Sequence, residues 1–305
     1  MTDLPVPPPF RPLYKDGPAV SSVAWGMWRF AGGGSGTELP MARARVEAAL
    51  AAGITLFDTA DIYGVSGPGF GSAEELFGRV LKDAPGLRER MVIATKGGIT
   101  PPTPYNSGAA HLAGAIDASL RRLGVERVEL YQVHRRDLLT HPQEVARTLD
   151  DARRAGKIGA VGVSNHAAME VDSLQAFLPV PVVSTQPEFS PLALQPLTDG
   201  VLDQAMARGM AVLAWSPLGG GRLGDPGEER TKAVADALDK VAEAYSVSRA
   251  AACYSWVMAH PAGIIPITGT QTPARIAEIP DSYKPRWSRE SWYAVLVAGR
   301  GEKLP

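Results

Sequence analysis

The sequence is short of cysteine, with Cys253 alone among 305 residues. A single cysteine excludes an internal disulfide and a zinc site built from cysteines. It lies in the apolar run AACYSWVMA, which favours a buried and unreactive thiol. We therefore expect no metal centre.

An excess of charge is also lacking, because 31 lysines and arginines face 32 aspartates and glutamates, a net charge of −1. This balance gives no reason to expect a nucleic acid or an anionic membrane surface as partner. No apolar run reaches the length of about 18 residues that a membrane span needs. The first ten residues, MTDLPVPPPF, lack the basic and apolar regions of a secretory signal. Together these absences predict a cytoplasmic protein that binds neither nucleic acid nor membrane.

Short β-rich runs alternate with amphipathic helical runs along most of the chain. Strands separated by helices imply parallel crossovers, and eight such units favour a closed (β/α)8 TIM barrel. An open, doubly wound sheet is the alternative. The eight predicted strands are residues 21–26, 54–58, 91–96, 127–134, 158–164, 182–186, 211–216 and 264–267.

Several segments fall outside the repeating unit. A long loop (99–110) follows the third predicted strand, and a glycine-rich loop (217–230) follows the seventh and leads to an extra helix. Both lie at the C-terminal face, where barrel active sites are built. Residues 286–305 are expected to form an outer helix and tail, and residues 1–17 an extended lead-in. No linker interrupts the pattern, so we predict one domain over residues 1–305.

Helix ends carry recognisable signals. Ser72 and Glu75 fit a capping box at the start of one predicted helix. Gly124 and Gly156 follow two other predicted helices, as a C-terminal glycine often does. These signals set the expected boundaries of the helices between the strands.

Three ionisable residues end successive predicted strands at equal spacing. Asp58, Lys96 and His134 are each 38 residues apart, close to the average length of one unit when 305 residues are divided among eight. The ends of parallel barrel strands converge at one mouth, so these side chains are expected to meet there. Tyr63 follows Asp58 by five residues and is expected in the loop above the same mouth.

This group of residue types suits proton transfer to an oxygen. A phenol has a pKa of about 10 and keeps its proton at neutral pH, and a nearby ammonium makes it a better acid. A carboxylate holds the ammonium in place, and a histidine can hydrogen-bond the same oxygen. Each residue alone is typical of a strand rim or cap, and the convergence of four favours a catalytic site. We expect Asp61, by contrast, to fix the loop that carries Tyr63.

Over nearly its whole length the sequence resembles the aldo-keto reductase superfamily. FDTADIYG, VIATKGG and LYQVHRRD are similar to that family's tetrad segments, and KIGAVGVSN, STQPEFSPL, AWSPLGGGRL and IPITGTQTPARIAE follow in its order. The LGGGRL loop and the short tail are most similar to a bacterial branch of oxidoreductases. The resemblance implies NADPH-dependent reduction of an aldehyde or ketone. It places Asp58, Tyr63, Lys96 and His134 on the catalytic tetrad, with Tyr63 as general acid.

The same resemblance assigns residues to the cofactor. Ser164, Asn165 and Gln186 fall where the nicotinamide carboxamide is held, and Trp215 falls where a tyrosine usually stacks on the nicotinamide ring. Arg275 suits a ribose 2′-phosphate, which a guanidinium can bind through two hydrogen bonds. The full set is Gly26, Met27, Trp28, Ser164, Asn165, Gln186, Trp215, Ser216, Pro217, Leu218, Gly219, Gly220, Arg222, Gly269, Thr270, Gln271, Arg275 and Glu278.

One position departs from the family pattern. Gly269 stands where some members have a lysine for the 2′-phosphate, so NADH is expected as a possible second cofactor beside NADPH. A cluster of glycines, GGGSG at 32–36, lacks the spacing of a dinucleotide fingerprint and is predicted to be a loop.

Two other functions fit the same pattern. One is an NAD(P)-dependent sugar or alcohol dehydrogenase, the same chemistry in reverse. The other is a cofactor-binding regulatory or interaction subunit, because a barrel can also serve as a scaffold. The complete tetrad favours an enzyme with a small carbonyl substrate. Arg135 and Arg136 could favour an anionic substrate or simply line a solvated rim; the sequence specifies neither the substrate nor the oligomeric state.

Overall fold

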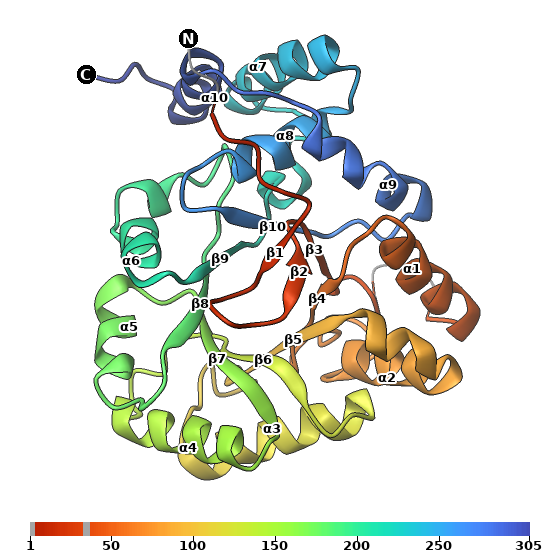
Figure 1. The fold of residues 1–305 in the computed structure, drawn as a ribbon, viewed down its shortest axis with the longest axis vertical. Coiled ribbons are helices and arrows are strands. Elements are labelled where there is room, and N and C mark those ends of the chain that lie inside the picture. Colours follow the sequence, from red (N-terminus) through yellow and green to blue (C-terminus); the bar gives the residue numbers. More distant parts are fainter. Residues whose placement is uncertain (1–3, 33–36) are drawn as a thin grey trace.

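A computed structural model describes residues 4–32 and 37–305. Residues 33–36, most of the predicted GGGSG loop, lie outside the described residues, as do the first three residues of the lead-in. Eight parallel strands close into a barrel in the order β10-β3-β4-β5-β6-β7-β8-β9 (Figure 1). The prediction of a closed barrel is confirmed, and the open-sheet alternative is wrong. The strands are β3 (Ala24–Gly26), β4 (Leu56–Asp58), β5 (Val92–Gly97), β6 (Val128–Val133), β7 (Ile158–Ser164), β8 (Val182–Gln186), β9 (Ala211–Ala214) and β10 (Ile264–Thr268).

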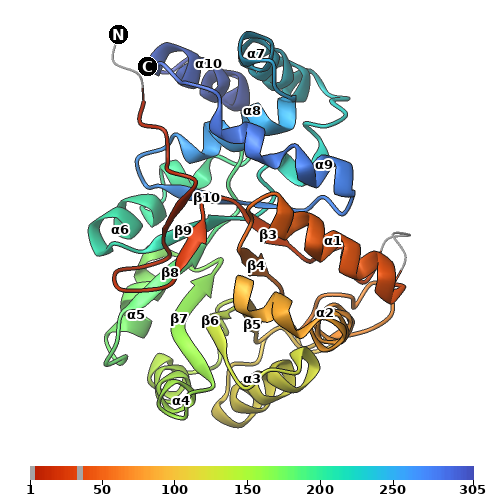
Figure 2. The same cartoon turned by 45° about the vertical axis from the view of Figure 1, so that its right-hand side comes forward.

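Helices surround the barrel. α7 and α10 pack against each other outside the ring, beside α8, at one side of the molecule (Figures 1 and 2). No helix within 4–32 and 37–305 is both long and apolar enough to cross a membrane. The helices are α1 (Leu39–Ala51), α2 (Ser72–Asp83), α3 (Ala109–Leu123), α4 (Pro142–Arg154), α5 (Ala168–Gln175), α6 (Val201–Arg208), α7 (Glu229–Tyr245), α8 (Arg249–Met258), α9 (Pro273–Ala277) and α10 (Arg289–Arg300), with short 3-10 turns η1 (Pro85–Arg90), η2 (Gln195–Leu197), η3 (Gly219–Gly221) and η4 (Ile279–Tyr283).

The period of two along β4 explains why an acid faces the mouth. Leu56 belongs to the cluster that fills the barrel, and Phe57 belongs to the cluster between barrel and helices. Successive side chains of a strand point to opposite faces, so Asp58 faces inward again, above Leu56. On β5 the same alternation places Lys96 two residues beyond the interior residue Ala94.

The helix ends follow the predictions in part. Gly124 and Gly156 have φ of 67° and 76°, the left-handed conformation expected of a glycine that ends a helix. The predicted capping box is wrong, because α2 already includes Ser72, and the residue at its N-cap is Gly71, with φ of 83°. Glu75 is exposed in the first turn of this helix.

Part of the lead-in forms a hairpin rather than a simple extended chain. β1 (Phe10–Pro12) pairs antiparallel with β2 (Ala19–Ser21), and the hairpin lies across the centre of the barrel in Figure 1. Leu13 and Val20 join the interior cluster. The backbone N–H of Thr55, just before β4, donates a 2.9 Å hydrogen bond to the hydroxyl of Ser21. The hairpin therefore covers the end where the strands begin, opposite the face that carries the ionisable groups.

Candidate active site

Lys96 links three oxygens at the C-terminal mouth of the barrel. Its Nζ donates hydrogen bonds of 2.7 Å to Oδ2 of Asp58, 2.8 Å to the carbonyl oxygen of Thr59 and 3.1 Å to the hydroxyl of Tyr63. The side chain is completely buried. Asp58 is held from its other side by Gln186, whose Nε2 donates a 2.9 Å hydrogen bond to Oδ1. The structure thus brings together the carboxylate, the ammonium and the phenol that the spacing predicts.

Burial and charge act in opposite directions on Lys96. Burial alone lowers the pKa of a lysine, but the Asp58 carboxylate and the Tyr63 oxygen outweigh it and raise the pKa above its ordinary value. The lysine is therefore charged at neutral pH. A charged lysine is what the phenol needs beside it to release a proton.

For Tyr63 the balance falls the other way. Burial raises the pKa of the phenol above 10, and the Lys96 ammonium opposes this rise without cancelling it. The ammonium therefore eases ionisation, as expected, but the net pKa lies above rather than below its ordinary value. Tyr63 holds its proton throughout the neutral range.

His134 completes the group from β6. Burial, followed by the positive charges of Lys96 and Arg135, lowers the pKa of His134 well below 6.5, so its imidazole is neutral at pH 7. Its ring meets the Tyr63 ring nearly edge-on, with centroids 6.0 Å apart. A neutral imidazole beside the phenol can hydrogen-bond a substrate oxygen without competing as an acid.

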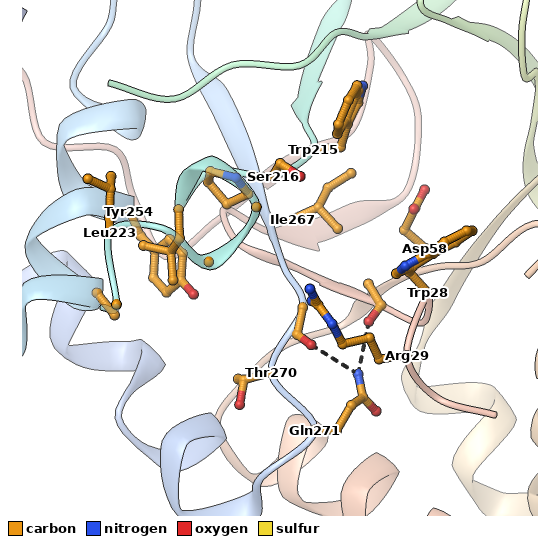
Figure 3. Close-up of a pocket in the computed structure, with 18 of the residues that line it drawn as sticks. Trp28, Arg29, Asp58, Trp215, Ser216, Leu223, Tyr254, Ile267, Thr270 and Gln271 are labelled. Carbon is orange, nitrogen blue, oxygen red and sulfur yellow. Dashed lines mark hydrogen bonds between the residues drawn. The ribbon is translucent and has the colours of Figure 1, made fainter. Parts of the chain in front are cut away.

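A cavity of about 1050 Å³ opens above these residues (Figure 3). Asp58, Tyr63 and His134 reach it, while Lys96 lies behind them. Trp28, 49% exposed, meets Tyr63 edge-on with ring centroids 5.1 Å apart. Fifteen of the residues predicted to bind the cofactor line it: Gly26, Trp28, Ser164, Asn165, Gln186, Trp215, Ser216, Pro217, Leu218, Gly220, Gly269, Thr270, Gln271, Arg275 and Glu278.

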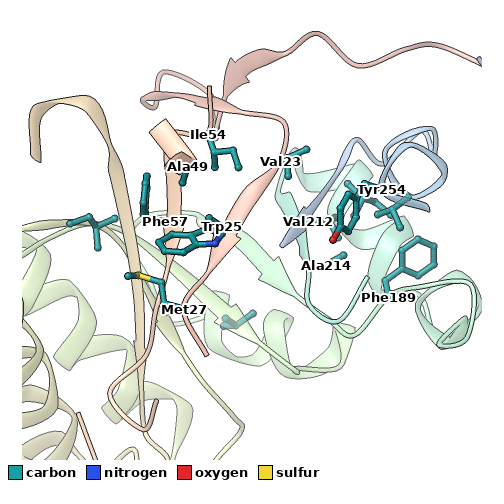
Figure 4. Packing of buried hydrophobic residues seen from close by; sticks show 14 of the residues in the cluster. Val23, Trp25, Met27, Ala49, Ile54, Phe57, Phe189, Val212, Ala214 and Tyr254 are labelled. Carbon is teal, nitrogen blue, oxygen red and sulfur yellow. The ribbon is translucent and has the colours of Figure 1, made fainter. Parts of the chain in front are cut away.

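The other three are not among the described residues that line the cavity. Met27 is fully buried in the cluster between barrel and helices, beside Trp25 and Phe57 (Figure 4). Gly219 packs against Leu192. A Cβ added to Gly219 would lie 2.6 Å from Cδ1 of Leu192. Arg222 turns back on the loop, and its Nε donates to the carbonyl of Gly219.

The cavity also has walls that the sequence reasoning missed. Arg29, next to Trp28, lines it, as do Gly221 and the start of α8 from Ser248 to Ala251. Arg135, for which the sequence leaves open an anionic substrate or a solvated rim, lines the cavity directly after His134. The position of Arg29 after a strand end could have suggested a role at the cavity. Its neighbour Gly269, at the end of the adjacent strand β10, is remote in sequence.

A network of polar groups holds the predicted nicotinamide region. Nε1 of Trp215 donates a 2.8 Å hydrogen bond to Oδ1 of Asn165. Nδ2 of Asn165 donates to the hydroxyl of Ser164 at 2.8 Å and to the carbonyl of His134 at 3.3 Å. The orientation of the Asn165 amide is therefore set by the indole of Trp215 on one side and by Ser164 and the carbonyl of His134 on the other.

The glycine-rich loop leaves room for a phosphate group. Gly220 and Gly221 have φ of 72° and 99°, and nothing lies within 4 Å of a Cβ placed at either residue. Such bare left-handed backbone favours glycine and allows close approach of phosphate oxygens. At the segment after β10, Nε2 of Gln271 donates to the carbonyl oxygens of Gly26 (3.2 Å) and Gly269 (3.4 Å). The cavity thus has a polar mouth, an open backbone loop and a cationic segment with Arg275, which together fit a dinucleotide.

A closed parallel barrel with a phenol, a buried ammonium and a dinucleotide-sized cavity at its C-terminal mouth defines a nicotinamide-dependent oxidoreductase. Comparison with known proteins agrees, since the model of the Aldo/keto reductase family matches residues 22–295. The chain belongs to the aldo/keto reductase family and is an NAD(P)H-dependent oxidoreductase.

Two curated relatives share a name. The 6-dehydroglucose reductase of Novosphingobium aromaticivorans is 57% identical, with 100% of each chain covered. The 6-dehydroglucose reductase of Agrobacterium fabrum is 35% identical, over 93% of this chain and 96% of the relative. A crystal structure of the thermostable aldo-keto reductase Tm1743 with the inhibitor epalrestat has a TM-score of 0.81 at 22% identity, covering 95% of this chain and 99% of that one. This last likeness concerns the fold.

Proposed function

We propose that the protein reduces the aldehyde of 6-dehydroglucose, or of a closely similar sugar aldehyde, with NADPH. The support for the substrate is the name carried by two relatives that match nearly the whole chain, one of them 57% identical. The support for the chemistry is the hydrogen bond from Lys96 to Tyr63 at the floor of the cavity. This pair is the observation on which the proposal rests.

NADPH, when bound in this cavity, would supply a hydride to the carbonyl carbon. Tyr63 gives its proton to the carbonyl oxygen, so that the aldehyde gains one hydride and one proton and becomes a primary alcohol. Lys96 stabilises the phenolate that forms, and Asp58 keeps Lys96 charged. Neutral His134 is placed beside the phenol to hydrogen-bond the same carbonyl oxygen.

The walls around the tetrad suit a small polyol. Trp28 offers an indole face, which can pack on the C–H face of a sugar. Arg135 lines the cavity next to His134 and offers guanidinium donors to hydroxyl groups. In this proposal Trp215 and Asn165 would hold the nicotinamide, and Gly220 and the segment from Thr270 to Arg275 would hold the phosphates. Reduction with NADPH also fits the cytoplasm, the compartment predicted from the sequence.

The test is consumption of NADPH by the purified protein with 6-dehydroglucose, compared with hexanal, an aldehyde of six carbons without hydroxyl groups. We expect kcat/KM for the sugar aldehyde to exceed that for hexanal by about 100-fold or more, since a site that hydrogen-bonds hydroxyls discriminates against substrates lacking them. Reduction of hexanal alone would contradict the sugar assignment, and no consumption with either aldehyde would contradict the proposed reduction.

A further inference from the structure

A guanidinium from the other end of the chain lies beside Gly269, the position at which the family resemblance would allow a lysine. A Cβ added to Gly269 would lie 3.2 Å from Nη1 of Arg29. Arg29 belongs to the loop after β3, and β3 pairs directly with β10, so the two strand ends are neighbours in the barrel. Figure 3 shows Arg29 beside the segment of Thr270 and Gln271.

The backbone does not explain why residue 269 is a glycine. Gly269 is absent from the positive-φ glycines of the described chain, so other residues could adopt its conformation. The nearest atom to a side chain at this position is the Arg29 guanidinium, and it is the single atom within 4 Å among the described residues. A lysine here would compete with Arg29 for the same space, so glycine at 269 and arginine at 29 form a matched pair.

Arg29 stands at the same cavity wall as the segment predicted to hold the adenosine ribose. Gly269, Thr270, Gln271 and Arg275 line this cavity together with Arg29. The segment is fixed from behind, because Nε1 of Trp25 donates a 2.8 Å hydrogen bond to the carbonyl of Thr270. The wall thus carries two guanidinium groups, Arg29 and Arg275, and guanidinium binds phosphate oxygens through paired hydrogen bonds.

We propose that Arg29 binds the ribose 2′-phosphate of NADPH in place of a lysine at position 269, and thereby makes the protein prefer NADPH over NADH. This proposal rests on the proposed function only in assuming that a nicotinamide dinucleotide occupies the cavity. If Arg29 supplies the second cation, the loss of the lysine no longer gives a reason to expect NADH as a second cofactor.

Binding measurements without turnover test it. Dissociation constants for NADPH, NADH, 2′,5′-ADP and 5′-ADP are measured by titration calorimetry for the wild type, Arg29→Gln, and Arg29→Gln combined with Gly269→Lys. We expect Arg29→Gln to weaken NADPH and 2′,5′-ADP by about 10- to 100-fold, the range of one charge-assisted hydrogen-bonded pair. NADH and 5′-ADP should change by less than about twofold, and the lysine should restore much of the NADPH affinity. Arg135→Gln, which removes another guanidinium of the same cavity, should leave all four affinities unchanged.

Two results would overturn the role of Arg29. Equal weakening of NADPH and NADH would mean that the guanidinium serves a group common to both, such as the pyrophosphate. An unchanged NADPH affinity would mean that the Arg29 guanidinium contacts neither the 2′-phosphate nor a group shared by the two dinucleotides. A wild type that binds neither NADPH nor NADH would instead overturn the proposed function itself. As a control, a melting temperature equal to that of the wild type shows that each variant is folded.

Discussion

The ammonium of Lys96 donates a 3.1 Å hydrogen bond to the hydroxyl of Tyr63, although no part of the lysine side chain is exposed. A buried charge is tolerated here because Asp58 lies 2.7 Å away on the other side. The same two contacts that stabilise the charge also place it against the phenol. Stability and proton transfer therefore depend on the same group of atoms, and a single substitution of Lys96 affects both.

Removing Lys96 alone should cost both stability and activity. Lys96→Met leaves the Asp58 carboxylate buried with the Gln186 amide as its remaining side-chain donor, and breaking a buried pair costs about 3–5 kcal/mol. Combining Lys96→Met with Asp58→Asn removes both charges and should recover a large part of that loss while activity stays absent. Urea unfolding of the single and double variants provides the measurement. A double variant no more stable than Lys96→Met would show that the unpaired Asp58 carboxylate is not the cause of the lost stability.

Trp215 should act through its N–H as well as its face. Trp215→Phe keeps an aromatic ring but loses the 2.8 Å hydrogen bond to Asn165, so the amide loses one of the contacts that orient it. We expect KM for NADPH to rise by about tenfold, the effect of one lost hydrogen bond of about 1–1.5 kcal/mol, with a smaller change in kcat. Steady-state kinetics at saturating aldehyde measure this. An unchanged KM for NADPH would mean that the hydrogen bond from Trp215 is not needed to orient the Asn165 amide.

Asp61 should make stability depend on pH. Burial, together with the nearby Glu74 carboxylate, raises the pKa of Asp61 to about 8, whereas an unfolded aspartate titrates near 3.9. The folded state therefore holds a proton that the unfolded state releases, and its stabilising effect is complete below about pH 4 and is lost as pH rises through about 8.

The comparison with Asp61→Asn isolates this effect. Between about pH 4 and 8 the free energy of unfolding of the wild type should fall by up to about 1.4 kcal/mol per pH unit relative to the variant. Denaturant unfolding at intervals of one pH unit gives the slope. Asp117→Asn, which removes a surface ion pair with Lys157, serves as control and should follow the wild type. Parallel curves for wild type and Asp61→Asn would show that Asp61 is ionised when folded.

Much of the candidate site could be predicted because barrel geometry repeats along the chain. Asp58, Lys96 and His134 end neighbouring strands, so an equal spacing in sequence becomes convergence in space. The same regularity could have corrected one assignment. Trp25 and Met27 share the outward face of the β3 segment, while Gly26 and Trp28 reach the cavity, so the period of two places Met27 in the core.

Other features depend on contacts that no local pattern carries. Arg29 and Gly269 are 240 residues apart and meet only because β3 and β10 close the barrel. The pKa of Tyr63 depends on how completely the phenol is buried, whereas the sequence reveals only that a lysine is near. The sequence predicts an extended segment instead of the hairpin of β1 and β2, because two strands of three residues are too short for a clear alternating pattern.

Tyr63 is proposed to supply the proton for NADPH-dependent carbonyl reduction, and substitution of this tyrosine tests the proposal. NADPH consumption with an activated aromatic aldehyde is measured for the wild type and Tyr63→Phe, and NADPH affinity is measured for both. We predict an active wild type, a variant slower by about 100-fold or more as a general acid is lost, and equal NADPH affinity. A Tyr63→Phe variant as active as the wild type would contradict the assignment of Tyr63 as the proton donor.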